Sequence, residues 1–269
     1  MPEGNVIHFQ AAKLRRLFEG QRIRVDSPQG RFADGAALVN GRTVRSVEAV
    51  GKHLFIDTGN DRSIHVHLGL FGKWRFGKGS APDPRGLIRM RLQSKDAYAE
   101  LRGPTRCEVL TTAEKDELLA RIGPDPIRAD ADPERAWQRI SRSQVAVGAL
   151  LMDQRTMSGV GNIYRAEVLF RHGISPFRPG KSLTRAEFDA VWADLVTLMR
   201  QGTKRGRIDT VRAEHLPEVM GRTARKDRHG GEVYVYRRNG QQCYLCGSTI
   251  NIETMQARKL YWCGTCQAS

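Results

Sequence analysis

Four cysteines near the end of the chain constrain its folding more than any other feature. Cys243, Cys246, Cys263 and Cys266 form two C-x2-C pairs with sixteen residues between them. Thiolates at this spacing can close as a tetrahedron around one zinc ion, and four protein ligands make such a site structural because no position stays open for water. Two disulfides or a redox pair are the alternatives. The residues between the pairs alternate like two strands of a hairpin, so we expect a zinc ribbon.

A large excess of basic residues indicates a polyanionic partner. The 269 residues include 44 Lys and Arg against 29 Asp and Glu, which gives a net charge of +15 and a pI near 10.1. Such an excess draws polyanions to the surface, and it favours nucleic acid over a merely solubilising role. No apolar stretch approaches the roughly 18 residues of a membrane span, and no secretory pattern is visible. We therefore expect an intracellular monomer, cytoplasmic or nucleoid-associated if bacterial.

The first half of the chain carries the pattern of a β-sandwich. Residues 6–20 place apolar side chains at helical spacing, and residues 22–110 form short segments that alternate apolar with polar residues between turns. This pattern predicts an antiparallel sandwich or barrel preceded by one helix. Prolines at 124, 126 and 133 then mark a linker, because proline favours extended backbone. We expect a β-sandwich domain with a leading helix over residues 1–121.

Helical periodicity returns after the linker. Apolar residues recur at helical spacing around 147–151, 163–173 and 187–199, whereas 202–230 is rich in Gly, Arg and Lys and is expected to include a mobile loop. The fold class is therefore α+β and multidomain. We expect a helical domain over residues 122–235 and a zinc ribbon finger over residues 236–269.

The N-terminus carries a candidate nucleophile. Removal of Met1 would expose Pro2, whose secondary amine has a reference pKa of roughly 8 and is substantially unprotonated near neutrality. Attack on a sugar carbon would form a cationic imine, which weakens bonds further along the sugar. Glu3 could exchange protons with the sugar. By itself, a proline at position 2 indicates only that the initiator methionine is trimmed.

Four separated segments carry motifs that match one family. They are MPEG at 1–4, VGKHL at 50–54, LMDQ at 151–154 with SGVGNIY at 158–164 and LFRHGI at 169–174, and ARKLYWCGTCQ at 257–267. In order and spacing the chain resembles the formamidopyrimidine-DNA glycosylase/endonuclease VIII family over nearly its whole length. The resemblance implies a catalytic β-sandwich, a helix-two-turns-helix domain and a zinc finger. It also implies a bifunctional DNA glycosylase/AP lyase that acts on damaged double-stranded DNA.

The resemblance assigns catalytic roles to four residues. Pro2 would attack C1′ of the damaged nucleotide, displace the base and form a Schiff base. Glu3 would donate the proton for base removal. Lys52 would bind the phosphate next to the lesion and assist β-elimination. Arg258 would hold a phosphate and support δ-elimination, although its position alone would suggest a solvated charge in a turn.

The resemblance also assigns DNA contacts. Asn162 begins a predicted helix, where backbone N–H groups favour phosphate, but asparagine is also a common helix N-cap. Arg121 would be a further phosphate contact. Leu70 and Phe71 would fill the space left by an extruded base, with core packing as the alternative for Phe71.

The chain departs from the family pattern at two places. Many members continue with Pro-Glu where this chain has Asn5 and Val6, which removes a carboxylate near Pro2 and bears on proton transfer there. The stretch 101–107 offers no phenylalanine of the Arg–Phe pair found in members specialised for oxidised purines. Together with Leu70, Phe71 and the Tyr-Trp-Cys ending of the finger, this second departure favours the endonuclease VIII branch and oxidised pyrimidines. His65 and His67, which alternate along a predicted strand, are interpreted as structural.

Two other functions fit parts of the sequence. A non-catalytic protein on the same scaffold would bind lesions or abasic sites without cutting, but such a protein should have lost a catalytic residue. An RNA-binding zinc-ribbon protein would explain the charge and the cysteines, and would leave the N-terminal motif unexplained. No redox cofactor or nucleotide site is expected.

Overall fold

The chain folds into two compact units, Met1–Arg121 and Ile122–Ser269. The structure is a computed structural model, and it describes residues 2–226 and 231–268. The loop predicted within 202–230 therefore lies partly outside the described residues. Division of the second unit into a helical domain and a finger at residue 235 stays a prediction.

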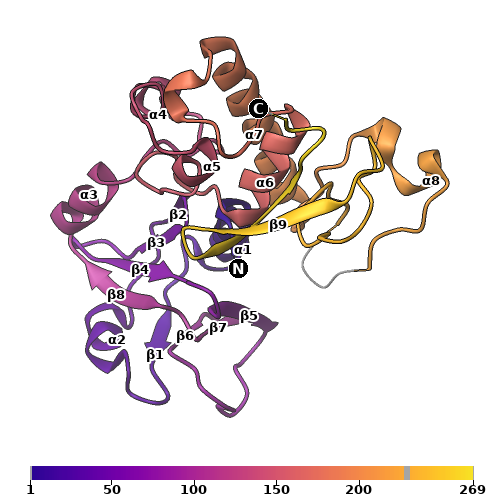
Figure 1. The fold of residues 1–269 in the computed structure, drawn as a ribbon. Helices are drawn as coiled ribbons and strands as arrows, with labels where there is room; N and C mark the ends of the chain where they lie inside the picture. The colour runs from indigo at the N-terminus through magenta and orange to yellow at the C-terminus, as the bar shows by residue number, and fades with distance from the viewer. Residues whose placement is uncertain (1, 227–230, 269) are drawn as a thin grey trace. The chain divides into compact units, whose positions relative to one another are not determined.

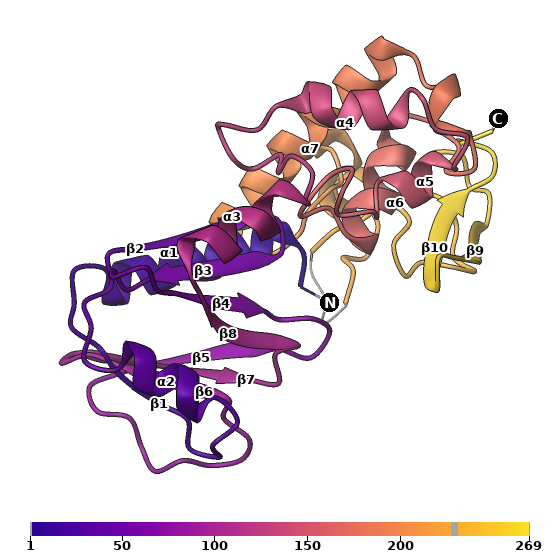
Figure 2. The same ribbon diagram turned by 90° about the vertical axis from the view of Figure 1, so that its left-hand side faces the viewer.

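Two antiparallel four-stranded sheets form the first unit. Their strand orders are β2-β3-β4-β8 and β1-β6-β7-β5, and the sheets form two layers in Figure 2. Inward-facing residues of both sheets share one buried cluster, so the predicted β-sandwich is confirmed. The strands are β1 (Arg24–Asp26), β2 (Ser46–Val50), β3 (His53–Asp57), β4 (Ser63–His67), β5 (Lys73–Lys78), β6 (Met90–Gln93), β7 (Ala97–Arg102) and β8 (Arg106–Leu110).

Helix α1 (Gly4–Phe18) is the predicted leading helix, displaced by two residues from the expected range 6–20. Its buried residues include Ile7, Leu14 and Phe18, at the three- and four-residue steps that place side chains on one helix face. This face joins the sandwich core, and the helix packs against β2 and β3. The core therefore holds the start of α1 in a fixed place on the first unit.

Four elements of the first unit were not expected from the sequence: α2 (Ala33–Val39), α3 (Thr112–Ala120), β5 and β7. Helix α3 had a visible signal, because Thr111 and Glu114 form a capping box. The Thr111 hydroxyl accepts from the Glu114 N–H at 3.2 Å, and the Glu114 carboxylate accepts from the Thr111 N–H at 2.8 Å. Strand β5 follows a glycine-rich stretch that is typical of a loop.

The second unit is helical around a buried central helix (Figure 1). Every residue from 162 to 170 of α6 is buried, and α6 packs against α5, α7 and β10. No helix in the described parts of the chain has the length and apolarity that crossing a membrane requires. The helices are α4 (Pro133–Ile140), α5 (Val147–Leu150), α6 (Asn162–Arg171), α7 (Arg185–Arg205) and α8 (Pro217–Met220), with 3-10 turns at Gly180–Ser182 and Ala213–His215.

A buried carboxylate links α6 to the segment that leads into the finger. Glu167 is fully buried and accepts from the backbone N–H groups of Tyr234, Val235 and Tyr236 at 2.7 to 2.8 Å. The Thr210 hydroxyl donates to the same carboxylate at 2.5 Å. Hydrogen bonds from several donors compensate the desolvation of a buried charge.

The boundaries of two helices differ from expectation. Pro133 was assigned to the linker, but it is the first residue of α4, where a proline needs no N–H partner, and the Asp132 side chain caps that helix. Helix α7 extends beyond the predicted range 187–199. It begins with a capping box of Thr184 and Glu187 and ends at Gly206, whose φ is 71°.

The cysteine-containing segment forms the predicted hairpin. Strands β9 (Ile250–Met255) and β10 (Arg258–Cys263) pair antiparallel, with Arg258 opposite Met255 and Cys263 opposite Ile250. The turn between them has only two residues, Gln256 and Ala257, with φ of 49° and 57°. Two positive φ values are the requirement of a type I′ turn, whose twist matches that of the strands.

Candidate functional site

Pro2 and Glu3 lie directly before helix α1. Pro2 is half-buried, and Glu3 is the N-cap residue with only 1% of its surface exposed. The Glu3 carbonyl accepts from the N–H groups of Val6 and Ile7 at 3.0 and 3.3 Å. The fold thus keeps an acidic side chain out of bulk water next to the candidate amine.

Lys52 lies at the same end of the first unit as Pro2 and Glu3. The Nε of Arg15 in α1 donates to the Val47 carbonyl of β2 at 3.1 Å. The backbone of Glu19, directly after the helix, forms an isolated β-bridge with Val44. Helix and strand therefore run in opposite directions. The eleven residues from Arg15 back to the helix start span about 16 Å at 1.5 Å per residue. The three extended steps from Val47 to Val50 span about 10 Å in the same direction, and the turn with Gly51 and Lys52 lies beyond them. The structure therefore brings these three predicted catalytic residues to one end of the sandwich.

A two-residue hairpin turn presents Lys52. The turn joins β2 to β3, with Val50 paired to His53 on either side of Gly51 and Lys52. Gly51 has a φ of 58°, which is the left-handed conformation that a type II′ turn requires at its first central residue and that glycine adopts at little cost. The motif VGKHL therefore has a local structural reason for its glycine.

Leu70 and Phe71 protrude from the loop between β4 and β5. Leu70 is 46% exposed and Phe71 is 84% exposed, so the core-packing alternative for Phe71 is wrong. Gly69 and Gly72 flank the pair. A Cβ at Gly69 would lie 1.8 Å from the Thr105 hydroxyl, and one at Gly72 would lie 2.3 Å from the Leu68 carbonyl. Close packing of these two glycines therefore fixes a loop whose tip offers bare apolar surface.

Arg121 is the C-cap residue of α3 and the last residue of the first unit. Its side chain is 71% exposed and pairs with Glu117 one helical turn earlier. An exposed pair of this kind contributes little to stability, so the guanidinium can exchange this partner for another at low cost. Within the first unit, no contact connects Arg121 to Pro2, Glu3 or Lys52 in the described residues.

Asn162 is the first residue of α6, and Gly161 is the N-cap. The N-cap explanation for this asparagine is therefore wrong. Asn162 is 7% exposed; its Nδ2 donates to the Lys259 carbonyl at 2.8 Å, and its Oδ1 accepts from buried Arg165. Arg165 also donates to the Gly148 carbonyl at 3.2 Å. The side chain of Asn162 thus connects the start of α6 to the hairpin strand that carries Arg258.

Arg258 begins β10 directly after the two-residue turn and is half-buried. Within residues 2–226 and 231–268, no carboxylate or carbonyl pairs with its guanidinium. The backbone of the next residue, Lys259, is the acceptor of the Asn162 hydrogen bond. The structure therefore brings Asn162 and Arg258 together in the second unit and leaves the charge of Arg258 available.

The four cysteines converge as the spacing predicts. All four sulfur atoms lie within 4.8 Å of one another. The Sγ atoms of Cys243 and Cys266 are 3.8 Å apart, and those of Cys246 and Cys263 are 3.4 Å apart. Disulfide sulfurs would lie about 2.05 Å apart, so these sulfurs are not disulfide-bonded.

The sulfur cluster fits a zinc ion. Four ligands at about 2.3 Å from a zinc would lie about 3.8 Å from one another in a tetrahedron, and the observed separations are close to this value. A hydrogen bond from the Ser248 side chain lowers the pKa of Cys246 to about 6, which favours the thiolate. Burial raises the pKa of Cys243 and Cys266 instead. Because a zinc ion deprotonates its thiol ligands, the donor set supports a structural metal site.

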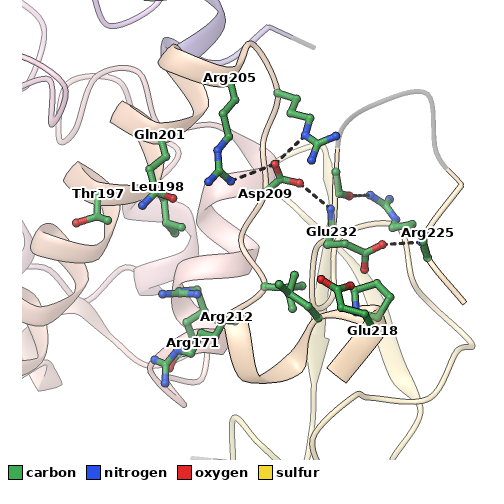
Figure 3. A pocket seen from close by; sticks show the side chains of 17 residues that line it. Arg171, Thr197, Leu198, Gln201, Arg205, Asp209, Arg212, Glu218, Arg225 and Glu232 are labelled. Atoms are coloured by element: carbon green, nitrogen blue, oxygen red, sulfur yellow. Dashed lines mark hydrogen bonds and ion pairs between the residues drawn. The ribbon is translucent and has the colours of Figure 1, made fainter. Parts of the chain in front are cut away.

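A cavity of about 850 Å³ in the second unit was not foreseen from the sequence (Figure 3). It lies between α7 and the segments around Asp209, Arg225 and Glu232. Arg205 and Arg207 both pair with Asp209, at 3.6 and 2.8 Å. The Arg225 N–H donates to Glu232 at 2.6 Å. The lining holds five arginines against three carboxylates, so the cavity keeps a net positive charge.

Known proteins resemble the chain over its full length. Residues 1–107 match the formamidopyrimidine-DNA glycosylase N-terminal domain, and residues 122–213 match the formamidopyrimidine-DNA glycosylase H2TH domain. Endonuclease 8 1 of Mycobacterium tuberculosis is 46% identical over 99% of this chain and 100% of its own length. The chain belongs to the formamidopyrimidine-DNA glycosylase/endonuclease VIII family. As a member of it, the protein is a DNA glycosylase with AP lyase activity in base excision repair.

Solved structures of the family share the fold. Formamidopyrimidine-DNA glycosylase of Lactococcus lactis, bound to DNA that contains an AP site, is 21% identical, with a TM-score of 0.79 over 99% of this chain and 100% of that one. MutM of Thermus thermophilus is 27% identical, with a TM-score of 0.76 over 99% and 98%. The predicted arrangement of sandwich, helix-two-turns-helix domain and cysteine finger is thereby confirmed.

Proposed function

We propose that the protein removes oxidised pyrimidines from double-stranded DNA through the amine of Pro2 and then cuts the strand by β- and δ-elimination. The observation that carries this proposal is the buried Glu3 at the start of α1, beside Pro2 and at the same end of the unit as Lys52. The first unit then supplies all three groups: the Pro2 amine, the Glu3 side chain sheltered from water, and the Lys52 cation for the adjacent phosphate.

Each step can be written for these residues. The Pro2 nitrogen forms a bond to C1′ while the bond to the base breaks, and the amine proton leaves with the base. Glu3 supplies a proton to the sugar ring oxygen so that the ring opens to a Schiff base. The Glu3 carboxylate then takes the C2′ proton, and the 3′ phosphate leaves. In a second elimination water takes the C4′ proton and the 5′ phosphate leaves, after which water releases the sugar fragment from Pro2. Lys52 and Arg258 stabilise the charge of the two phosphates.

The other candidate residues are proposed to contact the DNA. Leu70 and Phe71 enter the duplex where the damaged base leaves it, since large exposed apolar side chains stack well among bases. Asn162 and Arg121 bind phosphates. Zinc in the four-cysteine cluster holds the hairpin of Arg258, and we infer that the enzyme works as an intracellular monomer. The preference for pyrimidines rests on the 101–107 stretch, which lacks the phenylalanine of purine-specialised members, together with Leu70, Phe71 and the Tyr-Trp-Cys ending of the finger.

Borohydride trapping tests the mechanism and the substrate together. Protein with an exposed Pro2 is incubated with duplexes that carry thymine glycol, dihydrouracil, 8-oxoguanine or an abasic site. We expect an adduct that maps to Pro2, strongest with the pyrimidine lesions, and its loss in Pro2→Gly. An adduct with 8-oxoguanine alone would keep the mechanism and overturn the preference. Absence of any adduct at the abasic site, with DNA binding intact, would support the non-catalytic alternative instead.

A further inference from the structure

Three histidines and one glutamate share the outer face of the sheet β2-β3-β4-β8. His53 begins β3, His65 and His67 lie two residues apart on β4, and Glu108 lies on β8. The strand register places His53 opposite His67 and His65 opposite Glu108. Residues two apart on a strand share a face, so all four side chains lie on the same side of the sheet.

A chain of hydrogen bonds runs through three of these side chains. Glu108 Oε1 lies 2.9 Å from His65 Nδ1, and His65 Nε2 lies 2.9 Å from His53 Nδ1. An ionised carboxylate can only accept, so His65 donates from Nδ1 and accepts at Nε2 when neutral. His53 must then donate from Nδ1, which leaves its only lone pair on Nε2. The partners thus assign one tautomer to each ring.

The rings stay neutral near pH 7. His65 is fully buried, and the ring centroid of His53 lies 5.1 Å from that of His65 and 5.0 Å from that of His67. Burial lowers the pKa of all three histidines. The charges of Lys52 and Arg106 act in the same direction, and the pKa of His53 falls to about 3. Glu108 opposes the shift at His65.

Arg106 lies 3.6 Å from Glu108, and helix α3 is a further neighbour of this group. Lys115 pairs with Glu48 at 2.6 Å and lies 5.1 Å from the Phe55 ring. The Phe55 ring lies 5.0 Å from that of His65. Helix α3 and Phe55 therefore cover the middle of the chain of hydrogen bonds, Glu108 at one end stays partly exposed, and His53 at the other end directly follows Lys52.

We propose that Glu108, His65 and His53 form a relay that positions Lys52 for its phosphate. This inference rests on the proposed role of Lys52. The turn has two residues, so a fixed His53 ring fixes one end of the turn. A lysine side chain loses conformational freedom when it is held, and a site ordered in advance lowers the entropy cost that binding must overcome. Neutral rings also avoid repelling the ammonium group.

The salt dependence of DNA binding reports whether the Lys52 ammonium group neutralises a phosphate. The probe is a duplex with a tetrahydrofuran analogue of an abasic site, which cannot form a Schiff base with Pro2. Each phosphate neutralised contributes about 0.9 to the slope of log affinity against log salt. This slope is negative, and a lower slope here means one of smaller magnitude. We expect Lys52→Ala and His53→Leu each to reduce the magnitude of the slope by about 0.9. The double variant should match Lys52→Ala alone, because coupled residues are not additive.

A conservative variant separates positioning from packing. In His53→Asn the side-chain amide can donate to His65 from the position of Nδ1, so we expect its slope to match that of the unchanged protein. If Lys52→Ala alone has no effect, the proposed role of Lys52 is wrong, independently of the relay. If Lys52→Ala lowers the slope and His53→Leu does not, or if their effects add, the relay is wrong.

Glu108 gives a second test that does not depend on the folding of His53→Leu. Its side chain is 38% exposed, so truncation leaves no closed cavity. We expect Glu108→Ala to lower the slope toward that of Lys52→Ala and Glu108→Gln to preserve it, because the amide oxygen still accepts from His65. Equal slopes in Glu108→Ala and the unchanged protein would overturn the relay. Thermal unfolding of each variant gives its folded fraction at the assay temperature.

Discussion

Lys52 and Arg258, the two cations that are proposed to hold phosphates, lie on two different hairpins. The contacts that stabilise these two hairpins differ. Lys52 lies within the turn between β2 and β3, where Gly51 takes the positive φ. Arg258 follows a turn in which Gln256 and Ala257 both take positive φ, although neither is glycine. The first hairpin belongs to a four-stranded sheet, whereas the second has only two strands. A two-stranded ribbon is marginal on its own, so the second needs support from elsewhere.

The supports also differ in chemistry. Imidazoles and a carboxylate lie behind the turn of Lys52. The strand of Arg258 is held by an amide, Asn162, and by four thiols that fit a zinc ion. Acid should therefore weaken the first support, and loss of metal should weaken the second. Both hairpins are proposed to present a cation to a phosphate. The Lys52 hairpin should therefore be sensitive to pH, and the Arg258 hairpin to the supply of metal.

Loss of a zinc ligand should have the largest effect. We expect Cys246→Ser, or chelation of zinc, to reduce strand cutting by more than a hundredfold, because metal binding and folding of a small ribbon are coupled. Hydrogen exchange measured by mass spectrometry should show faster exchange in β9 and β10 and no change in β2 and β3. Equal protection of β9 and β10 with and without zinc would show that the hairpin needs no metal. Cys107→Ser, the same substitution at a cysteine on β8 of the first unit and outside the ligand set, is the matched control.

Acid should selectively weaken the first unit. The folded pKa of His53 is about 3 against 6.5 for an unperturbed histidine. Between these values the unfolded chain binds more protons, so stability is full above about pH 6.5 and falls as the pH decreases. At pH 5 the loss from His53 alone is about 2 kcal/mol, at 1.36 kcal/mol per pH unit. Hydrogen exchange of β3 and β4 at pH 7.5 and pH 5, corrected for the intrinsic rate, measures this.

The variant His53→Asn provides the control for acid. It removes one titrating ring and can keep the hydrogen bond to His65, so the pH dependence of β3 should become shallower. If the variant and the unchanged protein lose protection equally, the acid effect arises from other groups. Strand β10, which has no histidine in its support, should show the smaller change in either case.

Asn162 tests the support of the second hairpin at constant metal content. In Asn162→Asp the carboxylate can still accept from Arg165 but cannot donate to the Lys259 carbonyl. We expect about a tenfold decrease in the ratio of δ- to β-elimination products, equivalent to about 1.4 kcal/mol, with Schiff-base trapping at Pro2 retained. Arg258→Ala gives the full effect of losing the arginine, and Asn239→Asp, the same change at an exposed position of the second unit, is the matched control. An unchanged product ratio in Asn162→Asp, alongside a changed ratio in Arg258→Ala, would show that the amide does not position the arginine.

The sequence predicted those parts of this arrangement that depend on local pattern. Cysteine spacing predicted the convergence of Cys243 and Cys266, and helical spacing predicted helix α1 with Leu14 and Phe18 on its buried face, although Phe9, which was grouped with them, is exposed. The relay could not be predicted, because it depends on which residues of β3, β4 and β8 are paired, and His65 was interpreted only as structural. Asn162 and Lys259 lie 97 residues apart, so their hydrogen bond has no local signal. The capping box at Thr111 did have such a signal.

The turns themselves give the smallest predicted effect. Gln256 and Ala257 carry none of the usual turn signals, so the sequence could not locate this turn from composition. A non-glycine residue in the left-handed region costs roughly 1–2 kcal/mol, and part of the gain on changing it to glycine is offset by greater freedom of the unfolded chain. We expect Ala257→Gly to stabilise β9 and β10 by up to about 1 kcal/mol. Gly51→Ala should destabilise the other hairpin by about 1 kcal/mol.

These two substitutions should act in opposite directions only if both turns keep the backbone described here. Their opening free energies can be measured by native-state hydrogen exchange of the flanking strands, with Gly20→Ala as a control, since Gly20 also has a positive φ but lies outside both hairpins. A destabilising Ala257→Gly would mean that the Ala257 side chain makes contacts worth more than its backbone strain. A stabilising Ala257→Gly that also lowers the δ-elimination ratio would mean that the strain in this turn contributes to holding Arg258 in position.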